Sequence, residues 1–447
     1  MVFLRSFLSF RRPRLRRRQL LATPLLALAL LLAGCRQGSA PGEAPRREVS
    51  VWTLDLAPRF TPYMTQVIAA WERRHPGVKV RWTDVPWSSV ERKLLAAVFA
   101  RTAPDLVNLN PPFAANLASK GGLLDLRDIL PAAASGDYLP LIWQSGNQEG
   151  EQFAIPWYLT ARVTMANRRL LRQAGYAEPP RRWQEVPAYA EAVKRRTGRY
   201  ALFVTVVPDD SAELLESMVQ MGVQLLDGRR RAAFNSPEGR RAFAFWTDLY
   251  RRELLPREVV SQGYRRAIEL YQAGDLAQVA TGPDFLHNLR TNAPGIAAET
   301  VPSPPLTGPR GEANVAVMNL VVPRGSERAR EAVSFALFLT NAENQYRFAE
   351  EARVLPSSPV ALRRLRDRWR RETPRSREDR LVLDARLLSA DALDNARVLV
   401  PATPGIKRLQ AIVYTNLQRA MLGQITSDEA LSRAEQEWNR YAEARWP

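Results

Sequence analysis

The sequence predicts an α/β fold, because short apolar strands alternate with amphipathic helices in the first part of the folded chain. A β-type run at 49–52 precedes a helical pattern that Pro62 opens and that a His-Pro-Gly sequence ends. A second strand at 78–82, a helix at about 88–100 and a third strand at 105–109 follow. This order indicates a mainly parallel sheet, in which ligands are expected at the carboxyl ends of the strands.

The spacing of apolar and capping residues supports each helix. The first helix places four apolar side chains at i, i+3, i+4 and i+7: Met64, Val67, Ile68 and Trp71. The second has a shorter stripe: Leu94, Leu95 and Val98. Farther along, Ser236, Pro237 and Glu238 supply an N-cap, a proline at the first helical position and an acid in the first turn. Thr340 and Glu343 fit a capping box where two later helices meet.

The bulk composition describes a folded globular protein of 447 residues, of which 46% are hydrophobic and 25% charged. This length is sufficient for two or three domains. The formal net charge is +18, but the arginines are spread through every segment, and this argues against nucleic-acid binding. A single cysteine excludes an intrachain disulfide, and with only two histidines we expect no metal site. No cofactor is expected either.

The N-terminus has the pattern of an export and anchoring signal. Seven arginines within 5–18 precede an apolar run at 20–32, which suits a signal peptide and is shorter than the roughly 20 residues of a membrane span. The Leu-Ala-Gly-Cys sequence at 32–35 then resembles the bacterial lipobox, in which the thiol of Cys35 would receive a diacylglycerol. A signal peptide that happens to end in cysteine is the alternative. The arginine pair at 17–18 leaves both the Sec and the Tat route open.

Several segments of the body, in order along the chain, carry a family resemblance. The most extended blocks contain Pro-Asp-Leu-Val within 104–126, Ala-Ile-Pro-Trp-Tyr within 154–183 and Asn-Ser-Pro-Glu-Gly within 235–250. Shorter matches follow in the same order at 274–283, 335–339 and 355–357. Together they resemble the extracellular solute-binding proteins of family 1, the group of maltose-, oligosaccharide- and glycerol-phosphate-binding proteins.

The resemblance implies a type II periplasmic-binding-protein fold, with two discontinuous α/β lobes that close on a ligand in a central cleft. The chain should cross between the lobes near Leu159, near 299–302 and around 341–348. The expected segments are a signal peptide at 1–34, a lipidated tether at 35–48, the first part of lobe I at 49–159, the first part of lobe II at 160–300, the return to lobe I at 301–343 and the C-terminal part of lobe II at 344–447.

The same resemblance implies a substrate-binding lipoprotein of an ABC importer, which delivers a small carbohydrate or polyol to the permease subunits. We expect a monomer at the periplasmic or extracytoplasmic face, attached to the membrane through lipid on Cys35. A lipoprotein of the same fold that senses its ligand is one alternative, and a carbohydrate-active hydrolase with two carboxylates across the cleft is another. The chain has no G-x-S-x-G, H-E-x-x-H, P-loop or G-x-G-x-x-G motif, so binding without catalysis is favoured.

Candidate ligand residues follow from the chemistry of sugar sites, where aromatic faces cover the C–H face of the ring and polar groups bind its hydroxyls. By family likeness, Trp157 and Tyr158 face the cleft at the first crossing; hinge packing is the alternative. Trp52 ends the first strand and Asp55 lies in the following loop, with core packing and a turn as their alternatives. Asn110 lies just past the third strand, where it could also form a plain turn.

A later candidate loop departs from the family pattern. Gly282 and Pro283 resemble a loop that an aromatic residue usually follows, but here Asp284 stands in that place and Phe285 comes one position later. Arg353 could contact a hydroxyl or an anionic group, or form a surface ion pair.

A second departure lies near the C-terminus. Residues 401–404 resemble the segment before another stacking aromatic, and the residues offered there are polar or more distant: Lys407, Arg408, Gln410 and Tyr414. With fewer stacking aromatics, the expected ligand is small: a monosaccharide, disaccharide, glycosyl-polyol or glycerol phosphodiester.

Overall fold

The computed structural model describes residues 47–446 except 149, 209 and 401. The expected signal peptide, Cys35 and most of the tether therefore lie outside the described residues. Within the described part of the chain, no helix has both the length and the apolar character needed to cross a bilayer.

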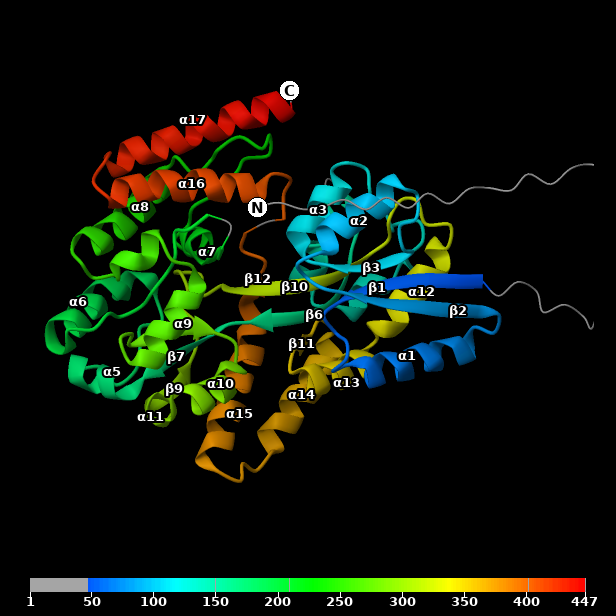
Figure 1. The fold of residues 1–447 in the computed structure, drawn as a ribbon, viewed down its shortest axis with the longest axis horizontal. Helices are drawn as coiled ribbons and strands as arrows, with labels where there is room; N and C mark the ends of the chain where they lie inside the picture. Colours follow the sequence, from blue (N-terminus) through cyan, green and yellow to red (C-terminus); the bar gives the residue numbers. More distant parts are fainter. Residues whose placement is uncertain (1–46, 149, 209, 401, 447) are drawn as a thin grey trace, which may run out of the picture. The chain divides into compact units, whose positions relative to one another are not determined.

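The larger sheet, which defines lobe I, has the strand order β11-β6-β10-β3-β1-β2, with β12 paired to β10 (Figure 1). Its strands are β1 (Arg47–Leu54), β2 (Val78–Val85), β3 (Leu106–Leu109), β6 (Ile155–Ala161), β10 (Ala313–Val321), β11 (Leu355–Pro356) and β12 (Ala396–Arg397). Strands β2 and β3 pair with β1 in parallel, but β10 is antiparallel to β3 and β6, and β6 is antiparallel to β11. The three strands from which a parallel sheet was predicted are parallel to one another, but the prediction fails for the sheet as a whole, which is mixed. The sheet is mixed because β6 carries the chain out of lobe I and β10 brings it back.

Helices cover both faces of this sheet. They are α1 (Thr61–Arg74), α2 (Val90–Phe99), α3 (Pro111–Ala118), α12 (Ala329–Leu339) and α13 (Ala342–Ala352). On one face, Trp71 of α1 and Phe335 of α12 pack against Val49. On the other face, Leu94 of α2 and Phe113 of α3 join the cluster around the opposite side of the strands. Successive side chains of β1 point to opposite faces of the sheet, so β1 contributes to the hydrophobic core on each face.

Lobe II is built around a small antiparallel sheet of order β8-β7-β9. Its strands are β7 (Val163–Asn167), β8 (Gln278–Thr281) and β9 (Thr300–Ser303). Its helices are α5 (Arg168–Ala174), α6 (Val186–Thr197), α7 (Glu213–Gln220), α8 (Pro237–Arg251), α9 (Tyr264–Ala273), α10 (Phe285–Asn292), α11 (Pro294–Glu299), α16 (Ile406–Met421) and α17 (Ser427–Arg445). Helix α8 begins where the sequence predicted, and Ser236 is its N-cap: the Ser236 hydroxyl accepts a hydrogen bond from the N–H of Gly239.

The remaining elements are short or connect the lobes. They are α4 (Pro140–Gln144), α14 (Pro359–Arg371), α15 (Arg377–Asp391), the hairpin of β4 (Asn147–Gln148) and β5 (Glu151–Gln152), and the single 3-10 turns Ala134–Asp137, Trp183–Glu185, Arg257–Val260 and Ala392–Asn395.

The chain passes between the lobes three times. It leaves lobe I at Arg162, between β6 and β7, and returns between 304 and 312, from β9 to β10. We expected 344–447 to belong to lobe II, whereas α13 and β11 still contact lobe I: Phe348 stacks on Trp157, and β11 pairs with β6. The last passage runs through α14 and α15, which lie below the crossing strands in Figure 1.

Candidate ligand site

A groove of about 590 Å³ lies between the two lobes. On lobe I it is lined by α2, by α3 and by the residues that follow α3. On lobe II it is lined by the start of α16 and the end of α17. A volume of this size matches the usual range for small-molecule sites, which is about 300–1,000 Å³.

Local sequence signals position α3 on its side of the groove. Asn110 follows β3 directly, and its side-chain oxygen accepts the N–H of Phe113 at 3.0 Å. Pro111 occupies the first helical position, where a missing N–H costs nothing. This capped start buries Phe113 and turns Asn116, one turn later, toward the groove. The predicted site residue Asn110 is thus the N-cap of a groove helix.

Gly405 positions the start of α16. Its φ of +81° is a conformation that side chains other than glycine rarely adopt. A Cβ atom at Gly405 would also lie only 3.1 Å from Tyr441 and 3.2 Å from Trp446. The absence of a side chain at this position therefore allows α16 to begin directly against the aromatic end of α17.

The groove combines aromatic, polar and basic side chains. Phe113, Tyr441 and Trp446 provide ring surfaces, and Asn116 and Ser119 provide an amide and a hydroxyl. Its charged residues are Glu91, Lys120, Lys407, Arg408 and Arg445. One ion pair crosses the groove, from the ammonium of Lys407 to a carboxylate oxygen of Glu91 at 3.4 Å.

The structure places Trp157 in the core of lobe I rather than in the groove. Its side chain is fully buried, and its ring stacks on Phe348 with centroids 4.9 Å apart. Tyr158 meets Trp157 edge-on and is itself partly buried. This arrangement favours the packing alternative for Trp157. Trp52 is likewise partly buried against the cluster around Leu54.

Asp55 lies at the carboxyl end of β1, in a turn. Its φ is +50°, and its carboxylate accepts the N–H of Trp87 at 2.8 Å. The side chain joins the loop after β1 to the loop after β2. Neither Asp55 nor Trp87 lines the groove as the structure describes it.

The other predicted residues meet at a different contact between the lobes. Asp284, at the start of α10, pairs with Arg353, at the end of α13, over 3.5 Å. Gly282 and Pro283 precede this pair, and Phe285 lies in the lobe II core against Tyr271. The ion-pair alternative for Arg353 is therefore the arrangement that the structure contains. These residues do not line the groove of 590 Å³.

Sequence reasoning did not identify the groove residues of α17. Tyr441 and Trp446 lie more than 300 positions from Phe113, and no local pattern brings them to α3. The available signal is the concentration of aromatic residues near the C-terminus. Lys407 and Arg408, which stand where the family pattern suggests an aromatic, do line the groove.

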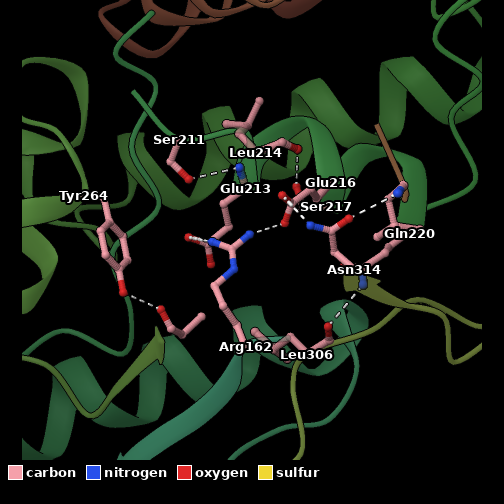
Figure 2. A network of polar contacts seen from close by, with 12 residues as sticks. Arg162, Ser211, Glu213, Leu214, Glu216, Ser217, Gln220, Tyr264, Leu306 and Asn314 are labelled. Carbon is pink, nitrogen blue, oxygen red and sulfur yellow. Dashed lines mark hydrogen bonds and ion pairs between the residues drawn. The ribbon is translucent and has the colours of Figure 1, made fainter. Parts of the chain in front are cut away.

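A second polar centre lies inside lobe II, where Arg162 meets two carboxylates of α7 (Figure 2). The guanidinium contacts Glu216 closely and Glu213 at 3.4 Å. Asn314 of β10 donates to the other oxygen of Glu216 at 2.8 Å. The network thus ties both crossing strands to one helix, because Arg162 follows β6 directly.

Burial dominates the electrostatics of this network. It raises the pKa of Glu213 to about 7, an effect that the charge of Arg162 opposes and the charge of Glu216 reinforces. Burial lowers the pKa of Arg162, but the two carboxylates outweigh it and the net direction is upward. The adjoining cavity of about 50 Å³ has room for one or two water molecules and is too small for a sugar. We therefore assign the network a structural role.

Comparison with known proteins adds the family relationship. The sequence profile of the bacterial extracellular solute-binding proteins matches residues 57–346. A candidate oligosaccharide periplasmic-binding protein from Synechococcus sp. MITs9220 is 66% identical, with a TM-score of 0.82 over 89% of this chain and 100% of that one. A second structure of that protein is in complex with zinc. Among the described residues here, no cluster of three or more His, Cys, Asp or Glu could hold a metal ion.

Two more distant relatives extend the comparison. The cyclic alpha-maltosyl-1,6-maltose binding protein of Arthrobacter globiformis shares the fold at 20% identity, with a TM-score of 0.74 over 89% of this chain and 99% of that one. An uncharacterized lipoprotein of Streptomyces antibioticus is 27% identical over 351 residues, which is 76% of each chain.

Proposed function

Because this chain belongs to the bacterial extracellular solute-binding protein family, we propose that it is the substrate-binding lipoprotein of an ABC importer. In this role it binds a small carbohydrate or polyol outside the cytoplasmic membrane and delivers it to the permease. The observation that carries the proposal is the groove between the lobes, where aromatic and hydrogen-bonding side chains lie together. The oligosaccharide- and maltosyl-maltose-binding relatives support a carbohydrate ligand.

The lining of the groove suits a sugar. The rings of Tyr441 and Trp446 can cover the C–H face of a pyranose, while Asn116 and Ser119 can exchange hydrogen bonds with its hydroxyls. Since these residues belong to different lobes, a ligand in the groove contacts both. A ligand that contacts both lobes stabilises the closed arrangement by the difference in its affinity for the two states.

Attachment to the membrane through Cys35 is part of the same proposal. It is supported by the Leu-Ala-Gly-Cys sequence at 32–35 and by the lipoprotein relative of Streptomyces antibioticus. An N-terminal lipid would hold the binding lobes near the permease. Its acyl chains would supply about 0.8 kcal/mol of membrane affinity for each buried CH₂ group.

Calorimetric titration and thermal unfolding with a panel of carbohydrates and polyols test the proposal. A ligand present at about 100 times its Kd should add about 2.7 kcal/mol to the free energy of unfolding. Trp446→Ala should weaken binding, whereas Phe99→Ala should not, because Phe99 is 86% exposed at the end of α2 and lies outside the groove. The bound sugar should be recovered unchanged. If no panel member binds, or if both variants bind like the parent, the groove is not the ligand site.

A further inference from the structure

We infer that the groove between the lobes binds an anionic ligand: a carbohydrate or polyol that carries a phosphate or a carboxylate. The inference rests on the proposed function, because it names the ligand class of the same groove. Its basis is the charge of the lining, which holds four basic side chains and one acidic one.

The basic residues come from three separate segments. Lys120 follows α3, Lys407 and Arg408 occupy the first turn of α16, and Arg445 ends α17. Lys407 pairs with Glu91, the acidic residue of the lining. For Lys120, Arg408 and Arg445, no carboxylate among the described residues lies within ion-pair distance. Three uncompensated cations thus face one concave space.

The place of Arg445 on α17 explains why it has no acidic partner on its own helix. On the same helix as Arg445, Arg433 pairs with Glu429 one turn earlier at 2.5 Å. The position one turn before Arg445 is instead Tyr441, which lines the groove. Arg445 therefore has no acid one turn earlier on its helix, because an aromatic residue of the groove occupies that position.

The start of α16 adds to the positive electrostatic potential of the groove. Helix N-termini carry a partial positive charge and favour acids in the first turn. Helix α17 follows this rule with Asp428 and Glu429, whereas α16 has no first-turn acid and no side-chain cap, and has Lys407 and Arg408 there instead. The positive charges of Lys407 and Arg408 are electrostatically unfavourable beside the partial positive charge at the N-terminus of this 16-residue helix. An anion bound at this end would offset the repulsion.

A further hydrogen-bond donor is available at the same place. The hydroxyl oxygen of Thr403 is buried, has no partner among the described residues, and belongs to a residue of the groove lining. A phosphate or carboxylate oxygen accepts from hydroxyl, guanidinium and ammonium groups alike. Tyr441 and Trp446 lie beside the basic residues, so a sugar ring and its charged substituent would occupy adjacent parts of one groove.

Matched ligands test the inference by calorimetric titration: glucose, glucose phosphate and glucuronate, then glycerol and glycerol phosphate, and inorganic phosphate alone. We expect an anionic member to bind at least about tenfold more tightly than its neutral counterpart, and its affinity to fall with added salt. The phosphate and carboxylate members identify which anion is recognised. Inorganic phosphate should bind more weakly than the phosphorylated ligand, because it leaves the aromatic faces uncovered.

Charge variants locate the effect. Arg408→Gln and Lys120→Gln should each weaken binding of the anionic ligand by about tenfold and weaken binding of the neutral ligand by a clearly smaller factor. Arg433→Gln, the control on α17, should change neither. Neutral sugars that bind as tightly as anionic ones, or charge variants without effect, would overturn the inference and leave the proposed function intact. Inorganic phosphate binding as tightly as every phosphorylated ligand would also overturn it. If no carbohydrate or polyol of either charge binds, the proposed function fails as well.

Discussion

Replacing Glu213 with glutamine should make the protein more stable at neutral and alkaline pH. Burial raises the pKa of Glu213 from 4.5 to about 7, so the folded protein holds this proton over a pH range in which the unfolded chain has lost it. The free energy of unfolding must therefore fall as pH rises from about 4.5 to about 7. Each pKa unit corresponds to about 1.36 kcal/mol, so the total loss is about 3 kcal/mol.

The Glu213→Gln variant removes this titration while keeping the shape of the side chain. Arg162 retains Glu216, its closer partner, so the guanidinium stays paired. Above about pH 7 the variant should exceed the parent by up to about 3 kcal/mol, and the difference should shrink toward zero near pH 4.5.

Urea unfolding of parent and variant at several pH values between about 5 and 8 measures the difference directly. Glu216→Gln is the matched control. It removes the carboxylate that both Arg162 and Asn314 contact, and breaking such a buried pair costs about 3–5 kcal/mol. If the difference between parent and Glu213→Gln does not change with pH, or if the parent gains stability relative to the variant as pH rises, the assigned protonation of Glu213 is wrong.

Three further substitutions have defined outcomes. Trp157→Ala should destabilise the ligand-free protein by about 3–5 kcal/mol in urea unfolding, since its ring is buried in the lobe I core; a loss of ligand affinity at unchanged stability would contradict this. Asn110→Ala should cost about 1 kcal/mol by the same measurement, because α3 loses its N-cap, and an unchanged midpoint would refute the capping role. Cys35→Ser should leave the N-terminus without lipid, as mass spectrometry would show; a parent protein with an unmodified Cys35 would disprove the anchor.

Much of lobe I could be predicted from local sequence patterns. The strands expected at 49–52 and 78–82 lie within β1 and β2, and the helix opened by Pro62 is α1. These elements have a clear apolar period, and they follow each other along the chain. Strand β10 is different, because two of its neighbours in the sheet, β3 and β6, are more than 150 residues earlier. Whether a strand runs parallel or antiparallel to its neighbours depends on which strands pair, and the apolar period of the sequence does not identify these pairs.

The groove proposed as the ligand site was harder to predict for the same reason. Family likeness pointed to the first crossing and to the loop after β8, where the structure contains the buried ring of Trp157 and the ion pair of Asp284 with Arg353. The groove instead joins α3 to the end of α17, two segments that are adjacent only in the folded chain. Composition showed an excess of arginine but not which bases lacked a carboxylate partner, since this depends on helix neighbours such as Tyr441 before Arg445.

The contacts between the lobes indicate how a ligand could control their arrangement. The pairs Lys407–Glu91 and Arg353–Asp284 bridge the lobes, but all four side chains are at least 42% exposed. Exposed ion pairs contribute about 0–1 kcal/mol each, so neither pair fixes the lobes in one position. A ligand could bind Lys407 and Arg408 of lobe II and Asn116 of lobe I at the same time. Two or three such hydrogen bonds, some of them charge-assisted, would stabilise the contact between the lobes more than the exposed ion pairs do. A ligand in the groove, and not the existing ion pairs, is therefore expected to decide how the two lobes are arranged.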